Sequence, residues 1–242
     1  MTEPSPTEPG AHLALVLDRV RFHWAGRNPF GLAISDFRIR QGERVLLLGQ
    51  SGSGKSTLLS LICGINAPGS GLIRVDGTDM AALRPAARDR FRAEKIGIVF
   101  QQFNLLPYAS PMDNILLPLR FAPGRRARAG DAQAAARALT DALGLAHGVM
   151  AQPTADRLSV GQQQRVAVAR ALIGAPSLIV ADEPTSALDA NAQAQFLDLL
   201  FAQCAAAGST LLMVSHDERL AHQFDRTVHL ADIATHSMAA AT

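Results

Sequence analysis

The sequence predicts an α/β protein built around an open sheet of parallel strands. Short apolar runs with the length of buried strands alternate along the chain with stretches of helical periodicity or high alanine content. A polar or glycine-rich segment follows several of these runs at the carboxyl end. Because open α/β sheets bind ligands along that edge, we expect a ligand site there.

Composition limits the classes of protein that the chain can represent. Its 242 residues, 48% hydrophobic and 18% charged, suffice for one sizeable core with a smaller lobe. We expect residues 1–11, which are polar and proline-rich, to form a disordered tail rather than a secretory signal, and residues 12–242 to form one domain. No apolar run approaches the roughly 18 residues that span a bilayer, so a membrane role requires a partner.

Charge and cysteine content add two further expectations. A net charge of +2 is too small to indicate a nucleic-acid partner, and none is expected. Cys63 and Cys204 stand in no metal-ligand or redox spacing, so we expect both to be buried as small hydrophobic residues.

The first predicted elements are short antiparallel strands over residues 13–17, 20–24 and 33–40, laid against the strand at residues 45–48. Trp24, the only tryptophan, falls at the end of one of them. An aromatic side chain there can stack on an adenine ring or anchor the core, and the local sequence favours neither.

A glycine-rich segment joins the strand at residues 45–48 to a predicted helix at residues 55–63. It fits the phosphate-binding pattern G-x-x-x-x-G-K-[ST] and comprises Gly49, Gln50, Ser51, Gly52, Ser53, Gly54, Lys55, Ser56 and Thr57. The glycines let backbone N–H groups surround a polyphosphate at the positive end of the helix. Lys55 would contact the β- and γ-phosphates and Ser56 the accompanying magnesium ion. The alternative is a glycine-rich turn with an accidental lysine, but only two of the 23 basic residues are lysines.

The middle of the chain continues the alternation. A strand over residues 71–77 closes in an Asp-Gly turn, a helix with proline near its start covers residues 85–94, and a further strand covers residues 96–100. Gln101 follows this last strand and is placed to contact magnesium or its water. Residues 132–143 predict a helix and residues 146–157 an irregular connection.

Three arginines between these elements, Arg125, Arg126 and Arg128, lie beside Pro123, Gly124 and Gly130. Two interpretations are open for them, a solvated loop and a surface that binds a phosphate backbone. We expect the solvated loop.

Leu158-Ser159-Val160-Gly161-Gln162 opens a long predicted helix that runs to residue 173. Ser159 can cap this helix, which leaves backbone donors pointing out of its first turn. Taken alone, the segment favours an ordinary capped helix.

Two more polar groups follow predicted strands. Asp182 and Glu183 end the strand at residues 178–181, and because side chains alternate along a strand the two carboxylates can hold magnesium and face an attacking water, respectively. A helix follows at residues 191–206, and the strand at residues 210–214 then leads to His216. That histidine is either a surface residue or a member of the same site.

These motifs, taken in order, resemble those of the ATP-binding subunit of ATP-binding-cassette (ABC) transporters over residues 13–233, including the loop at residues 186–189. The resemblance implies a P-loop NTPase with a RecA-like core sheet, an antiparallel β subdomain and a helical subdomain at about residues 101–172. It implies an ATPase that uses ATP and Mg²⁺ and powers an integral-membrane permease from the cytoplasmic face of the inner membrane.

The resemblance also assigns roles to residues. Trp24 aligns with the aromatic that stacks on adenine, and Gln101 with the glutamine that links catalysis to the membrane subunit, Gln102 being a less favoured substitute. The catalytic residues would be Glu183, His216 and Lys55, and the magnesium ligands Ser56, Gln101 and Asp182.

The segment at residues 158–162 matches the family's signature, which binds the γ-phosphate held by a second copy. The resemblance therefore implies a head-to-tail homodimer with two ATP molecules at its interface. Ser159, Gly161 and Gln162 are retained, whereas Val160 replaces the usual glycine, which leaves the packing at that position open.

Residues 99–107 and 113–119 resemble the lipoprotein-releasing and macrolide- or peptide-exporter branch more than nutrient importers. The rival within the family is an amino-acid importer ATPase. The rival from another class is a non-transport ABC protein acting on nucleic acid or the ribosome, but such proteins usually carry two cassettes or a long coiled-coil insertion.

Overall fold

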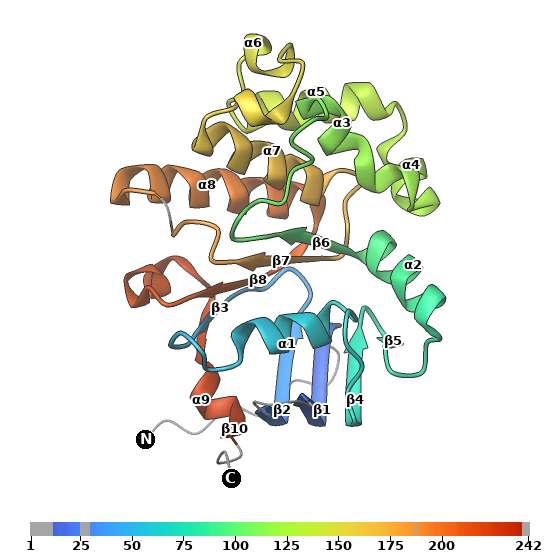
Figure 1. Ribbon diagram of the computed structural model, residues 1–242, viewed down its shortest axis with the longest axis vertical. Coiled ribbons are helices and arrows are strands. Elements are labelled where there is room, and N and C mark those ends of the chain that lie inside the picture. The colour runs from blue at the N-terminus through green and yellow to red at the C-terminus, as the bar shows by residue number, and fades with distance from the viewer. Residues whose placement is uncertain (1–11, 25–29, 187, 239–242) are drawn as a thin grey trace.

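The computed structural model describes residues 12–24, 30–186 and 188–238, and the tail predicted at residues 1–11 lies outside these ranges. Within them the chain forms a parallel sheet, an antiparallel sheet and helices on both sides of the parallel sheet (Figure 1). The predicted α/β class, with sheets of both kinds, is confirmed.

The parallel sheet has the order β6-β7-β8-β3-β9. Its strands are β3 (Arg44–Leu48), β6 (Ile96–Val99), β7 (Leu178–Asp182), β8 (Thr210–Ser215) and β9 (Arg226–His229). Every neighbouring pair is parallel, with Leu48 opposite Ser215 and Asp182 opposite Val214. The carboxyl ends of these strands therefore meet at one edge, as the sequence predicts.

The antiparallel sheet has the order β10-β2-β1-β4-β5. Its strands are β1 (Leu13–Trp24), β2 (Phe30–Arg40), β4 (Ser70–Val75), β5 (Thr78–Asp79) and β10 (Ala234–Met238). The prediction of two strands at residues 13–17 and 20–24 was wrong, because β1 is continuous through an irregularity at Arg19, where φ is 49°. The Asp76-Gly77 turn is present, with both residues left-handed (φ 45° and 77°).

Alternating side chains of the parallel strands supply two separate cores. Leu46 and Leu48 face α7 (Val160–Leu172) and α8 (Ala190–Ala207), whereas Val45 and Leu47 face α1 (Lys55–Ile62) and the antiparallel sheet. Both faces are apolar because both are covered (Figure 1). Cys63 and Cys204 are buried and unpaired, one in each core, as expected.

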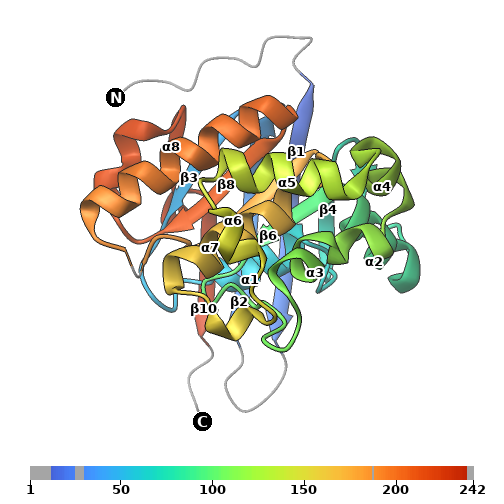
Figure 2. The same ribbon diagram turned by 90° about the horizontal axis from the view of Figure 1, so that it is seen from above.

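The remaining helices are short. They are α2 (Pro85–Lys95), α3 (Pro111–Leu116), α4 (Pro123–Ala129), α5 (Ala132–Ala142), α6 (His147–Met150) and α9 (Leu230–Ile233), with 3₁₀ turns η1 (Leu117–Arg120), η2 (Ala155–Arg157) and η3 (Glu218–Gln223). The group from α3 to α6 gathers on the side of α7 away from the parallel sheet (Figures 1 and 2). The connection predicted as irregular at residues 146–157 thus contains α6 and η2, and α3 and α4 were not predicted.

Arg125 corrects the prediction of a solvated arginine loop. It lies in α4 and is only 2% exposed. Its guanidinium donates hydrogen bonds to the carbonyls of Ala171 (2.8 Å), Ile173 (2.8 Å from Nε) and Ala93 (3.3 Å), and burial lowers its pKa to about 10. The run of charges and the loop-like composition cannot reveal this role, since the acceptors are carbonyls at the ends of α7 and α2, which are distant in sequence.

Arg125→Ala should destabilise the protein by about 3 kcal/mol, because it leaves several buried carbonyls without a donor. The matched control is Arg126→Ala in the same helix, where the side chain is exposed and the change should stay within about 0.5 kcal/mol. Denaturant unfolding of both variants measures the difference. Equal stability of the two variants would contradict the buried role of Arg125.

Candidate nucleotide-binding site

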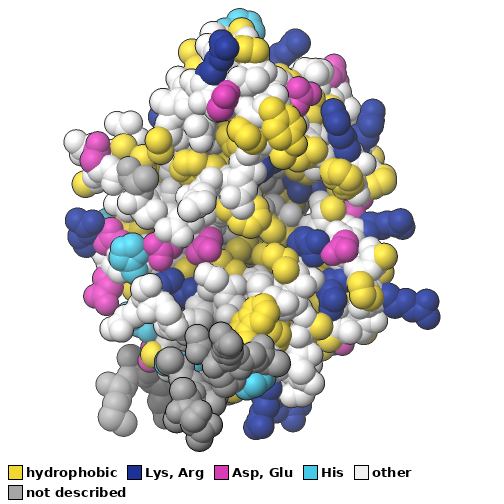
Figure 3. Space-filling model, in the orientation of Figure 1, with side chains coloured by type: hydrophobic (Ala, Val, Ile, Leu, Met, Phe, Trp, Pro, Cys, Tyr) yellow, Lys and Arg dark blue, Asp and Glu magenta, His cyan; other side chains and the backbone are white. Residues whose placement is uncertain are grey.

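A cavity of about 700 Å³ opens at the carboxyl edge of the parallel sheet. The residues that line it are Trp24, Phe30, Gln50, Ser51, Gly52, Gly54, Lys55, Ser56, Thr57, Gln101, Asp182, Glu183 and His216. They come from both sheets and from the segments after β3, β6, β7 and β8. Acidic and histidine side chains gather on this flank of the molecule (Figure 3). The fold therefore assembles most of the residues that the sequence singled out.

The glycine-rich loop presents an uncapped helix end to this cavity. Gly54 is the N-cap of α1 in a left-handed conformation (φ 100°), and no side chain of the described residues caps the helix. A Cβ at Gly54 would lie 2.9 Å from the Phe30 ring, so the position requires glycine on two grounds. The first N–H groups of α1 are thus left for an anion.

Lys55 is buried beneath the loop. Its Nζ donates hydrogen bonds to the carbonyl oxygens of Gly49 (2.6 Å) and Gln50 (2.9 Å) and lies 3.5 Å from Oε1 of Glu183. With a side chain only 9% exposed, the ammonium has Glu183 as its charged partner.

Glu183 is held in an unusual backbone conformation. Its φ is 43°, a left-handed value that disfavours residues with a side chain, and its N–H donates to the carbonyl of Val214 at 2.9 Å. Its Oε2 lies 2.8 Å from Nδ1 of His216. The Glu183 carboxylate therefore bridges the Lys55 ammonium and the His216 imidazole.

The neighbouring Asp182 lies in a different electrostatic environment. Burial raises the pKa of its carboxyl and the charge of Glu183 raises it further, while Lys55 acts in the opposite direction. Two carboxylates and one ammonium thus share a partly buried site, which is an environment that favours binding of a further cation.

Trp24 stands at the rim of the cavity and is not a core anchor. It is 42% exposed, packs edge-to-face on Phe22 with ring centroids 5.0 Å apart, and donates from Nε1 to Oγ1 of Thr57 at 3.3 Å. The indole keeps an open surface on which a planar ring can stack.

Several predicted site residues lie outside this cavity. Gly49 and Ser53 line a neighbouring hollow of about 390 Å³, which shares Gln50 and His216 with the main cavity. Gln101 lines the main cavity, whereas Gln102 does not.

The signature residues Ser159, Gly161 and Gln162 also lie outside the cavity. Ser159 caps α7 in a capping box, in which the Ser159 side chain accepts from the Gln162 N–H and the Gln162 side chain accepts from the Ser159 N–H. Val160 is 52% exposed, so its side chain meets no packing conflict within one chain.

The sequence analysis missed Phe30, which lines the cavity beside Trp24 and stacks on His236 of β10 at a centroid distance of 6.3 Å. Its position depends on β10 pairing with β2, in which His236 lies opposite Leu32. No local motif signals this contact, because its two sides are some two hundred positions apart in the chain.

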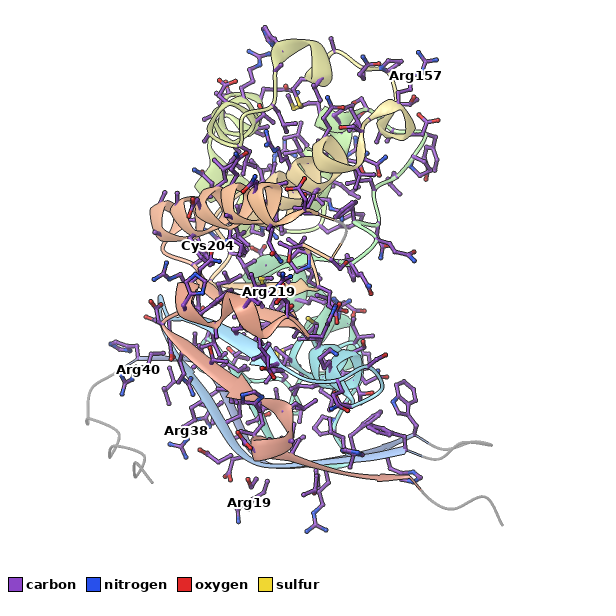
Figure 4. The ribbon with its side chains drawn as sticks, turned by 90° about the vertical axis from the view of Figure 1, so that its left-hand side faces the viewer. Arg19, Arg38, Arg40, Arg157, Cys204 and Arg219 are labelled. Atoms are coloured by element: carbon purple, nitrogen blue, oxygen red, sulfur yellow. The ribbon has the colours of Figure 1, made fainter. Side chains whose placement is uncertain are left out.

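Several arginines lie on the antiparallel sheet. Arg19, Arg38 and Arg40 project from the outer side of the antiparallel sheet, well away from Arg219 (Figure 4). Arg219 is paired with Asp217 at 2.8 Å.

A strand, a glycine-rich loop ending in Lys55 and Ser56, and an acidic pair at the carboxyl end of β7, which β8 separates from β3 in the same parallel sheet, define a P-loop nucleotide-binding protein. Comparison with known proteins narrows this class. The model of the ABC transporter family matches residues 32–186, and the chain belongs to that family.

Among similar proteins is the lipoprotein-releasing system ATP-binding protein LolD of Syntrophotalea carbinolica, with 42% identity over 81% of this chain and 85% of that protein. The macrolide export ATP-binding/permease protein MacB of Rhodopirellula baltica is 40% identical over 80% of this chain and 28% of its own length. Among solved structures, the ATP-binding cassette MJ0796, a dimer bound to ADP and Pi, superposes with a TM-score of 0.75 at 34% identity over 89% of this chain and 93% of that chain.

The chain is thus an ATP-binding subunit of an ABC transporter, an ATPase that works with a membrane permease. In the described part of the chain, no helix combines the length and the apolar character needed to cross a bilayer.

Asp182→Asn should stabilise the ligand-free protein at neutral pH. Because folding raises the pKa of Asp182, the ionised carboxylate destabilises the folded state above that pKa, and the penalty fades as the pH falls to the ordinary aspartate value near 3.8. Thermal unfolding of both proteins across the acid range, without nucleotide or metal, should show an advantage of the variant that disappears in acid.

Asp217→Asn is the control, because the pKa of Asp217 is shifted in the opposite direction to that of Asp182. A hydrogen bond from Arg219 lowers the pKa of Asp217 to about 2, so the ionised carboxylate stabilises the fold at neutral pH and this contribution is lost in acid. The variant should be less stable at neutral pH. If Asp182→Asn behaved in the same way as Asp217→Asn, the electrostatic account of the site would be wrong.

Proposed function

We propose that this ATPase powers a permease of the lipoprotein-releasing or exporter type from the cytoplasmic face of the inner membrane. The observation that carries the proposal is the cavity at the carboxyl edge, which Lys55, Asp182 and Glu183 all line, in a chain 40–45% identical to lipoprotein-releasing subunits over most of its length. The export ATPase MacB supports the same branch.

The residues of the cavity divide the binding of ATP among them. The adenine would stack on Trp24, and the N–H groups at the start of α1 would bind the β- and γ-phosphates together with Lys55. Since the Lys55 ammonium now donates to the carbonyls of Gly49 and Gln50, binding requires it to exchange those acceptors for phosphate oxygens.

The donor set fits magnesium. Ser56, Gln101 and Asp182 all line the cavity and offer a hydroxyl, an amide and a carboxylate oxygen, the ligand types that Mg²⁺ prefers beside phosphate. When bound, the ion offsets charge that develops on the transferring phosphoryl group.

Hydrolysis would depend on Glu183 and His216. The Glu183 carboxylate accepts a proton from the attacking water as the water oxygen bonds to the γ-phosphorus and the bond to the leaving β-phosphate oxygen breaks. His216, whose Nδ1 lies 2.8 Å from Oε2 of Glu183, would donate to a γ-phosphate oxygen from Nε2, which requires the imidazolium form because the Nδ1–H already donates to the carboxylate.

The remaining donors would come from a second copy. The signature residues lie outside the cavity of their own chain, and the capping box of α7 uses the Gln162 N–H of its first turn. We therefore propose a head-to-tail homodimer with two ATP molecules at its interface, in agreement with the dimeric MJ0796 cassette. The elements between residues 101 and 172 would form a helical subdomain that presents this signature.

Glu183→Gln should leave ATP binding intact and lower turnover by about 10²–10⁴-fold, because the amide cannot accept the proton. Isothermal titration with ATP and a phosphate-release assay separate the two effects. Wild-type turnover by Glu183→Gln would show that another group acts as the base.

The same variant tests the dimer. Slowed hydrolysis should let Glu183→Gln accumulate as an ATP-dependent dimer in gel filtration with light scattering, and adding Ser159→Arg should keep it monomeric by blocking the signature. A Glu183→Gln protein that stays monomeric at saturating ATP would contradict the proposed interface.

The branch of transporter is tested by capture of the partner. Tagged Glu183→Gln with ATP should retain a permease from detergent-solubilised membranes of the source cells, and depletion of that permease should stop release of lipoproteins or export of a drug or peptide. Capture of an amino-acid importer permease, or of ribosomes in place of a membrane protein, would overturn the proposed branch.

A further inference from the structure

Gln164 is a buried polar residue on an otherwise apolar side of α7. It is 2% exposed, and the positions from Val166 to Leu172 that follow it are buried as well. A buried amide is costly unless its hydrogen bonds are made. Its Nε2 donates to the carbonyl oxygen of Pro184 at 2.6 Å, a contact between two segments twenty positions apart.

The acceptor of this bond belongs to the residue directly after Glu183. Pro184 has no N–H, so its carbonyl is the backbone group through which this point of the loop can be held. On the other side, the Glu183 N–H donates to the carbonyl of Val214 at 2.9 Å. Glu183, with its left-handed φ of 43°, is therefore held between one bond to β8 and one bond to α7.

The other end of α7 holds a second loop of the site. The guanidinium of Arg170 donates to the carbonyls of Phe103 and Asn104, which follow Gln101 and are both left-handed (φ 58° and 47°). One helix thus begins at the signature, holds the loop after Glu183 in its middle and holds the loop after Gln101 near its end. A shift of α7 would move both loops.

We propose that Gln164 is a positioning residue for Glu183: its amide fixes the Pro184 carbonyl so that the Glu183 carboxylate stays between Lys55 and His216. It touches neither nucleotide nor water and acts through the backbone. The inference rests on the proposed function of Glu183 as the base, and it adds a physical link between the signature helix and that base within one chain.

Gln164→Met tests the inference, because it preserves size and removes the donor. We expect kcat for ATP hydrolysis to fall about tenfold to hundredfold, since small displacements of a catalytic group have effects of that order, with KM and ATP affinity within about twofold of wild type. The matched control is Gln163→Met on the same turn. The Gln163 side chain donates to the Leu158 carbonyl and not to the loop after Glu183 among the described residues, so this variant should leave kcat unchanged.

A double-mutant cycle separates positioning from general structural damage. If Gln164 acts through Glu183, then Gln164→Met should cause no further loss of single-turnover rate in the Glu183→Gln protein. The same fold-loss in both backgrounds, a wild-type kcat, or a rise in KM alone would overturn the inference. If Gln164→Met does not fold, Gln164→Leu, which also removes the donor and buries no charge, carries the same cycle.

The experiments distinguish failure of the proposed function from failure of the positioning role of Gln164. Wild-type turnover by Glu183→Gln would remove the base assignment and the inference together. A strong loss by Glu183→Gln combined with full activity of Gln164→Met would remove only the positioning role and leave the proposed function standing.

Discussion

The shared direction of four neighbouring strands is the constraint on which the site depends. Because β6, β7, β8 and β3 pair in parallel, the residues that follow them come to one edge, with Leu48 beside Ser215 and Asp182 beside Val214. The loops need only one or two residues beyond each strand to reach a common cavity. If any one of these strands ran antiparallel, its polar group would lie at the opposite edge, about one strand length away.

The partly buried charges at this edge are unbalanced, because two carboxylates share the site with one ammonium. The Lys55 ammonium lies 3.5 Å from Glu183 and lowers the pKa of Asp182, but burial and the charge of Glu183 outweigh it, so that the pKa of Asp182 is raised. The N–H groups of α1 add positive potential for an anion, while the second carboxylate leaves room for a cation. A ligand that contains both an anion and a cation, such as a metal-bound triphosphate, fits both the N–H groups of α1 and the carboxylates.

The sequence could predict the parts of this protein that follow local rules. The glycine-rich loop, the Ser159 cap and the acidic pair after β7 each depend on a few consecutive residues, and the structure places them in the predicted elements. Arg125 and Gln164 could not be predicted in this way. One sits in an arginine-rich segment and the other in a run of three glutamines, both typical of exposed surfaces, and each is buried because of carbonyl groups supplied by a distant element.

Buried side chains that bond to carbonyls give α7 a role beyond presenting the signature. A helix packed only through apolar contacts can shift by small amounts at little cost, whereas a hydrogen bond such as that from Gln164 to Pro184 weakens steeply with displacement. In the proposed dimer, the signature would contact the γ-phosphate of the ATP bound by the other copy, and this contact would shift the first turn of α7. The bond would then convert a small movement of α7 into a change at Glu183, so that the base is fully aligned only when ATP is enclosed from both sides.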